Sequence, residues 1–147
     1  MGLFSKKKLD VLKYESLKNV SITDVKEKYF DHILEFEETI VLVKLVKFYI
    51  KSELIVTNKY FWCINDNPKS YNRSKKPVLV SSVKEFYNHQ RDTNKIVIKL
   101  GIIYPDCHNK TMYLNECDVV KITPKTNCYG FNIITENEIE EYFSQIK

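Results

Sequence analysis

The chain has almost no small side chains, and this scarcity limits the folds it can adopt. Its 147 residues include no alanine and only three glycines, at positions 2, 101 and 130. Loops that wrap a phosphate depend on glycine, because the backbone must approach the ligand closely. The core must instead be built from branched and aromatic side chains, which favour strands. We therefore expect a β-rich structure without a glycine-dependent nucleotide loop, and none of the common glycine-rich or zinc-protease motifs occurs.

Length and charge fit a single domain. The apolar share of 44% suffices for a core, and the net charge of +4 permits an anionic partner without requiring one. The chain has 21 lysines and two arginines, a bias that AT-rich codons produce. AT-rich coding without a recognisable family motif is typical of a fast-evolving gene, such as that of a virus, a phage or a mobile element.

The sequence predicts a soluble, cytoplasmic protein. Its first residues, MGLFSKKK, lack the apolar core of a secretory signal. The most hydrophobic stretch, Thr39–Ile50, contains Lys44 and Lys47 and is far shorter than the roughly 20 residues of a spanning helix. Gly2–Lys8 resembles an acylation signal, but Lys6 stands where that signal has a hydroxyl residue, so we expect no membrane contact there.

Three segments carry a helix-start pattern, a hydroxyl residue followed three positions later by an acid. The predicted helices cover 21–37, from about 82 to 90, and 135–147. In the first, apolar residues recur at spacings of three and four, which predicts one buried face. The three pairs are Ser21 with Asp24, Ser82 with Glu85, and Thr135 with Glu138.

The segments between these helices are rich in β-branched and aromatic residues and predict strands. Short connections separate them, so we expect antiparallel neighbours. The predicted fold class is α+β: one mostly antiparallel curved sheet of about five or six strands, with helices on one face and a helix at the C-terminus. Residues 1–20 would form a basic arm or short helix, and residues 21–147 a single α+β domain. The predicted strands are Thr39–Ile50, Glu53–Ile64, Pro77–Val80, Lys95–Tyr104, Thr111–Ile122 and Cys128–Ile134.

The strongest candidate site is the basic segment 68–77, which contains no acid and follows an aromatic strand end. Cations beside exposed aromatic rings suit a phosphate backbone with a stacked base. The alternative is a plain surface loop with the tryptophan in the core. Because lysine dominates, any nucleic-acid binding would be non-specific and salt-sensitive. The candidate ligand-binding residues are Trp62, Lys69, Tyr71, Arg73, Lys75 and Lys76.

Metal binding and catalysis receive little support, and we expect no cofactor. Cys107, Cys117 and Cys128 stand too far apart for the paired spacing of structural zinc. Together with Cys63 they are expected to be reduced thiols. A hydrolase could use Cys107 with a histidine, or the acids of 106–121, but no spacing there favours either.

We therefore expect a non-catalytic binding or regulatory module that acts through protein–protein contact, because ten tyrosines supply anchoring residues for an interface. Non-specific binding of nucleic acid or another anion through 69–76 is the first alternative. A cryptic hydrolase is the second.

Overall fold

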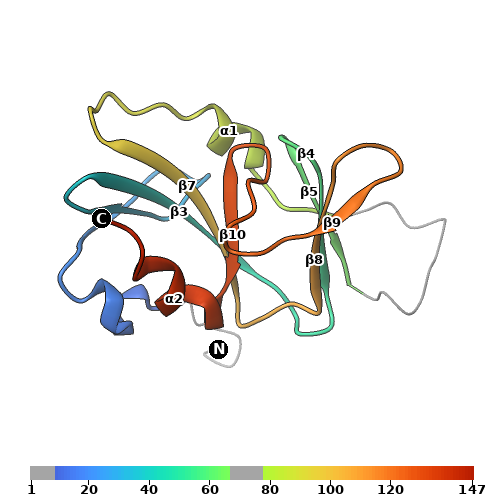
Figure 1. Ribbon diagram of the computed structural model, residues 1–147, viewed down its shortest axis with the longest axis horizontal. Helices are drawn as coiled ribbons and strands as arrows, with labels where there is room; N and C mark the ends of the chain where they lie inside the picture. Colours follow the sequence, from blue (N-terminus) through green and yellow to red (C-terminus); the bar gives the residue numbers. More distant parts are fainter. Residues whose placement is uncertain (1–8, 67–77) are drawn as a thin grey trace.

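Two five-stranded mixed sheets form most of the molecule. The computed structural model describes residues 9–66 and 78–147, of which 41% lie in strands and 16% in helices (Figure 1). The strand order is β1-β2-β3-β7-β10 in the first sheet and β6-β5-β4-β8-β9 in the second. The strands are β1 (Ser21–Asp24), β2 (His32–Glu35), β3 (Thr39–Lys47), β4 (Glu53–Asn58), β5 (Phe61–Asn65), β6 (Val78–Leu79), β7 (Ile96–Tyr104), β8 (Asn109–Tyr113), β9 (Val119–Lys121) and β10 (Phe131–Thr135). The helical segments are η2 (Val11–Lys13), η3 (Glu15–Leu17), α1 (Val83–Asn88), η4 (Glu136–Glu138) and α2 (Ile139–Phe143).

Parallel strands occupy the centre of the first sheet. β3 and β7 pair in parallel over nine residues, from Thr39 with Ile96 to Lys47 with Tyr104, and β10 pairs in parallel with β7. Consecutive residues of β3 are apolar and buried, so both faces of the strand are covered. Parallel strands of this kind need cover on both sides, which the rest of the fold supplies.

The two faces of the first sheet are covered by different layers. The second sheet and α1 cover one face, where Leu42, Ile103 and Trp62 belong to a shared core. The segment 9–20 and α2 cover the other, where Leu17 and Phe143 are buried. Figure 1 shows this N-terminal segment beside α2. The result is a layered structure with two cores.

The predicted α+β fold is wrong, because the described part of the molecule consists mostly of two mixed sheets and does not have one antiparallel sheet with helices on one face. The antiparallel pairs predicted across the short connections are wrong as well. The connections after β3, β7 and β9 are short, but each carries the chain into the other sheet instead of back along its own strand. Short connections force antiparallel pairing only when both strands belong to one sheet. The connections after β3 and β7 run together, as Phe48 N donates to Tyr104 O (2.9 Å) and His108 N to Ser52 O (2.6 Å). The chain therefore crosses from the first sheet to the second twice in the same way: β3 and β7 lie parallel in the first sheet, and β4 and β8, which follow them, lie parallel in the second.

The helix predicted over 21–37 is also wrong. This segment forms the antiparallel hairpin β1–β2, and β2 pairs with the edge of β3. Ile33 contacts one core and Leu34 the other, so the strand buries apolar groups on both faces. A helix would bury one face only and would leave the backbone edge of β3 without a partner.

The other two helix starts are confirmed, with differences in detail. α1 begins after Ser82, but Ser82 has a left-handed backbone (φ 65°) and does not cap it. Thr135 and Glu138 form the predicted capping box, followed by η4 and α2. Helix α2 ends at Phe143, short of the chain end.

An ion pair between buried Lys110 and half-buried Glu138 joins the second sheet to this C-terminal cap. Glu138 Oε1 accepts hydrogen bonds from Thr135 N (2.9 Å) and Thr135 Oγ1 (3.0 Å), and it lies 3.1 Å from Lys110 Nζ. Lys110 is buried and also donates to Ile122 O at 3.0 Å. Among the described residues, no helix is both long and apolar enough to span a bilayer.

Candidate functional site

Only one of the six residues of the predicted basic site lies among the described residues, so the structure does not test the site as a whole. Its members at positions 69, 71, 73, 75 and 76 lie outside the described residues. Trp62 is described and is 1% exposed, with its ring packed edge-on against Phe131 and beside Gly101. Trp62 is thus a core residue that offers no face to a ligand, as the alternative interpretation of this segment held.

A different set of lysines and tyrosines gathers on the surface. Lys59 Nζ lies 5.0 Å from the ring centre of Tyr60 and 5.4 Å from that of Tyr87. Lys84 Nζ lies 5.5 Å from the Tyr60 ring. Lys99 Nζ lies 5.6 Å from the Tyr87 ring. The two rings meet edge to face with their centres 5.5 Å apart. We call these five residues the lysine–tyrosine cluster.

Three elements bring the cluster together. Lys59 and Tyr60 form the turn between β4 and β5, where Asn58 Oδ1 accepts from Tyr60 N at 2.9 Å and shapes the turn. Lys84 and Tyr87 stand three residues apart on α1, and residues at this spacing are neighbours on a helix surface. Lys99, on β7, donates from Nζ to the Tyr87 carbonyl, which links this strand to the end of α1.

The cations of the cluster have no carboxylate partner. The ion pairs between described residues all lie elsewhere, and residues 1–8 and 67–77 contain no Asp or Glu. Burial lowers the pKa of Lys99 below its usual value, since a half-buried ammonium loses hydration. An approaching anion would therefore meet cations whose charge no neighbour neutralises.

Two open hollows are lined in part by Tyr87. One has a volume of about 590 Å³ and the other of about 500 Å³, and Tyr87 and Gly130 border both. These volumes fall within the usual range for ligand sites. We call the first the basic hollow and the second the apolar hollow. The basic hollow is lined by Asn88, His89, Gln90, Arg91, Val97 and Lys99, and the apolar hollow by Lys59, Met112, Leu114, Asn127 and Tyr129.

His89 gives the basic hollow a titratable group. Its Nδ1 lies 2.9 Å from the Tyr29 hydroxyl, and its Nε2 is buried with no hydrogen-bond partner in the described structure. Burial lowers the pKa of His89, Arg91 and Lys99 lower it further, and Glu27 opposes them. The imidazole is therefore neutral at neutral pH, held so mainly by burial and by the cations beside it.

The apolar hollow is formed where the 127–130 turn reaches the second sheet. Tyr129 has a left-handed backbone (φ 55°), and its hydroxyl donates to the Tyr113 carbonyl. Gly130 N donates to Asn127 Oδ1 at 2.6 Å, which closes the turn. Leu114 is 56% exposed beside it. The turn thus places an aromatic ring and aliphatic groups next to the lysine–tyrosine cluster.

Comparison with protein-family models, curated proteins and solved structures finds no match. The function must therefore be argued from the site itself.

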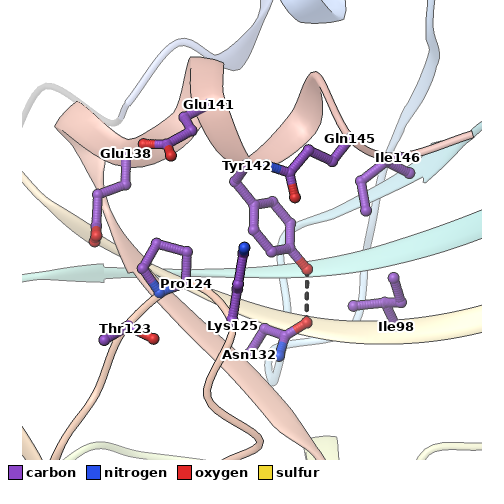
Figure 2. Close-up of a pocket in the computed structure, with 10 residues that line it drawn as sticks. All are labelled: Ile98, Thr123, Pro124, Lys125, Asn132, Glu138, Glu141, Tyr142, Gln145 and Ile146. Atoms are coloured by element: carbon purple, nitrogen blue, oxygen red, sulfur yellow. Dashed lines mark hydrogen bonds between the residues drawn. The ribbon is translucent and has the colours of Figure 1, made fainter.

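A third hollow, of about 410 Å³, lies against α2 and the start of β10 (Figure 2). Its central polar groups already have partners: the Tyr142 hydroxyl donates to Asn132 Oδ1 at 2.7 Å, and Asn132 Nδ2 donates to Thr126 O at 3.2 Å. Glu138, on its border, holds Lys110. These bonds attach α2 to β10, so the groups have a structural role.

Of the residues considered for a hydrolase, Cys107 is half-buried, and Asp106 and Asp118 take part in local hydrogen bonds. Burial raises the pKa of the Cys107 thiol to about 11, so it is protonated at neutral pH. Asp106 accepts a hydrogen bond from the Cys107 backbone N–H, and Asp118 takes part in a local turn with Asn115. Among residues 9–66 and 78–147, no three His, Cys, Asp or Glu side chains are placed to hold a metal ion.

Sequence reasoning missed the lysine–tyrosine cluster because its members are spread over 41 positions, from Lys59 to Lys99. Two local signals were present: Lys59 next to Tyr60, and Lys84 three residues before Tyr87. Neither is unusual in a chain with 21 lysines and ten tyrosines. Only the packing of α1 beside the β4–β5 turn brings them together.

Proposed function

We propose that this protein is a non-catalytic binding module for single-stranded nucleic acid, and that the lysine–tyrosine cluster is its contact surface. The observation that supports this proposal is the alternation of unneutralised lysines with half-buried tyrosine rings. Single strands are held by cations that follow the backbone and by aromatic rings that stack on bases.

Lysine dominance sets the expected character of the binding. A lysine acts on a phosphate as a point charge and does not distinguish bases. We expect binding that tolerates any sequence and weakens as salt rises, with a logarithmic slope of about −0.7 per phosphate neutralised. Duplex DNA should bind less well, because its bases are not free to stack on tyrosine.

Titration of a fluorescent oligothymidylate at about 50 and about 200 mM salt tests the proposal. A Lys59→Gln/Lys84→Gln variant should bind roughly tenfold more weakly at low salt, with a slope smaller by about 1.4 for the two lost phosphate contacts. Lys51→Gln/Lys121→Gln is the matched control, because both lysines are exposed and neither lies over a ring of the cluster or lines either hollow. The proposal fails if wild-type protein does not bind at low salt, or if both variants lose affinity equally.

Protein–protein binding, the first expectation from sequence, has a different supporting observation. The outer face of the second sheet carries the exposed apolar residues Phe61 (46%), Leu79 (46%) and Val119 (48%), with Cys63 paired between Leu79 and Ile55. An exposed apolar sheet face suits an apolar surface of a partner protein. In a pull-down from the native host, a partner retained by wild-type protein and lost by Leu79→Glu/Val119→Glu would support this function.

We also propose an intracellular location. All four cysteines are free thiols in the structure. Reducing compartments keep thiols in this state, whereas secreted domains of similar size commonly use disulfides. Reaction of the unfolded protein, freshly isolated from its host, with a thiol reagent should therefore detect four thiols per chain.

A further inference from the structure

The two hollows beside Tyr87 differ in chemistry. The basic hollow holds Arg91, Lys99 and His89, whereas the apolar hollow holds Leu114 and Tyr129 among its lining residues. Phosphate is bound by guanidinium and ammonium groups, and a base is bound by flat or aliphatic surfaces with few polar atoms. Each hollow therefore suits one part of a nucleotide.

Arg91 and Lys99 give the basic hollow two cations that differ in exposure. Arg91 is exposed, and Lys99 is half-buried and anchored by its hydrogen bond to the Tyr87 carbonyl. Their charges also lower the pKa of His89. An anion in the basic hollow would be attracted by both charges, and the guanidinium of Arg91 has hydrogen-bond donors that can hold two of its oxygens.

The two hollows have two border residues in common, Tyr87 and Gly130. Gly130 has a left-handed backbone (φ +97°), and a Cβ built on it would lie 3.8 Å from Tyr87 Cε2. Because Gly130 has no side chain, it contributes only backbone to the border that the two hollows share with Tyr87. Asn127, in the same turn, also lines the apolar hollow; its Oδ1 accepts from Gly130 N, which leaves its Nδ2 as a donor for a base edge.

We propose that one nucleotide lies across Tyr87 and Gly130, with its phosphate in the basic hollow and its base in the apolar hollow. This inference rests on the proposed function and assigns the phosphate and the base of one nucleotide to separate residues. It also makes the phosphate and base contributions separable, because they come from different residues.

The experiment compares an oligothymidylate with an abasic oligonucleotide of the same length, which keeps the phosphates and lacks the bases. Arg91→Gln should weaken binding of both by about tenfold. Leu114→Ser should weaken the oligothymidylate by about fivefold and leave the abasic strand unchanged. Lys121→Gln and Ile50→Ser are matched controls, being exposed residues outside both hollows.

The outcomes separate this inference from the proposed function. If wild-type protein binds neither oligonucleotide, nucleic-acid binding itself is wrong. If it binds both and Leu114→Ser weakens them equally, or Arg91→Gln affects only the oligothymidylate, the assignment of the hollows is wrong while nucleic-acid binding stands. If neither variant changes either affinity, the strand lies elsewhere and the inference is likewise overturned.

Discussion

Gly101 is the position where a single methyl group should most clearly disturb the core. It lies in the middle of β7, opposite Trp62 of the second sheet. A Cβ built on Gly101 would lie 2.9 Å from Trp62 Cη2 and 3.1 Å from Trp62 Cζ3. Carbon atoms in contact normally stand about 3.5–4.0 Å apart. Gly101→Ala therefore requires the indole ring or the facing sheet to move.

The expected cost follows from how little room the ring has. Trp62 is 1% exposed, and Phe131 packs against it with ring centres 4.9 Å apart. Overpacking in such a core costs about 1–3 kcal/mol, while replacing a strand glycine with alanine returns about 0.5–1 kcal/mol of backbone entropy. We expect Gly101→Ala to lower the free energy of unfolding by about 1–2 kcal/mol.

Urea unfolding followed by circular dichroism measures this, and Trp62→Phe supplies the control. Phenylalanine is smaller than tryptophan and should relieve the clash, so Gly101→Ala in that background should be neutral or stabilising. The coupling between the two sites should be about 2 kcal/mol. Equal destabilisation by Gly101→Ala in both backgrounds would refute the argument that Trp62 packs on this glycine.

Three further predictions concern the core and its cap. Glu138→Ala should destabilise the fold by about 3 kcal/mol because it leaves buried Lys110 uncompensated, and more than Lys110→Met does; equal losses in urea unfolding would contradict this. Thr135→Ala should cost about 1 kcal/mol by the same assay through loss of the capping box, whereas an unchanged midpoint would show that the cap is dispensable. Burial raises the pKa of Cys128 from 9.0 to about 12, so the unfolded chain loses this proton first as pH rises. Stability should then fall between pH 9 and 12 by at most about 1.4 kcal/mol per pH unit, and Cys128→Ala should remove this part of the loss.

Local signals predicted the elements better than their pairing. The β-branched runs mark eight of the ten described strands, although the runs Glu53–Ile64 and Thr111–Ile122 each form two strands where one was predicted, and β1 and β2 lie in the segment predicted as a helix. Thr135 begins the C-terminal helical segment as predicted. The segment 21–37 shows the limit of such signals, because Ile33 and Leu34 can serve a helix stripe or the two faces of a strand. Pairing of β2 with the edge of β3 decided between them, and the spacing of apolar residues within 21–37 does not report such a pairing.

The sequence also contained a pattern that favours parallel pairing, against the antiparallel pairing predicted. Both β3 and β7 contain long apolar runs, which indicate strands covered on two faces and so favour parallel neighbours. Short connections pointed the other way, towards hairpins. Parallel strands and short connections are compatible here because each connection leads into the second sheet. The second sheet also explains the position of Trp62, which was predicted as a site residue and lies in the core between the two sheets.

By itself, the sequence determined the chemistry available to this protein. The scarcity of glycine and alanine excluded phosphate-wrapping loops and favoured strands, because branched and aromatic side chains pack well on a pleated surface. The tertiary structure alone decided which residues meet. Lys59, Lys84 and Lys99 become neighbours only when α1 packs between the β4–β5 turn and β7. Contacts between residues far apart in the sequence depend on how whole layers pack, whereas a local sequence pattern indicates only backbone preference and burial.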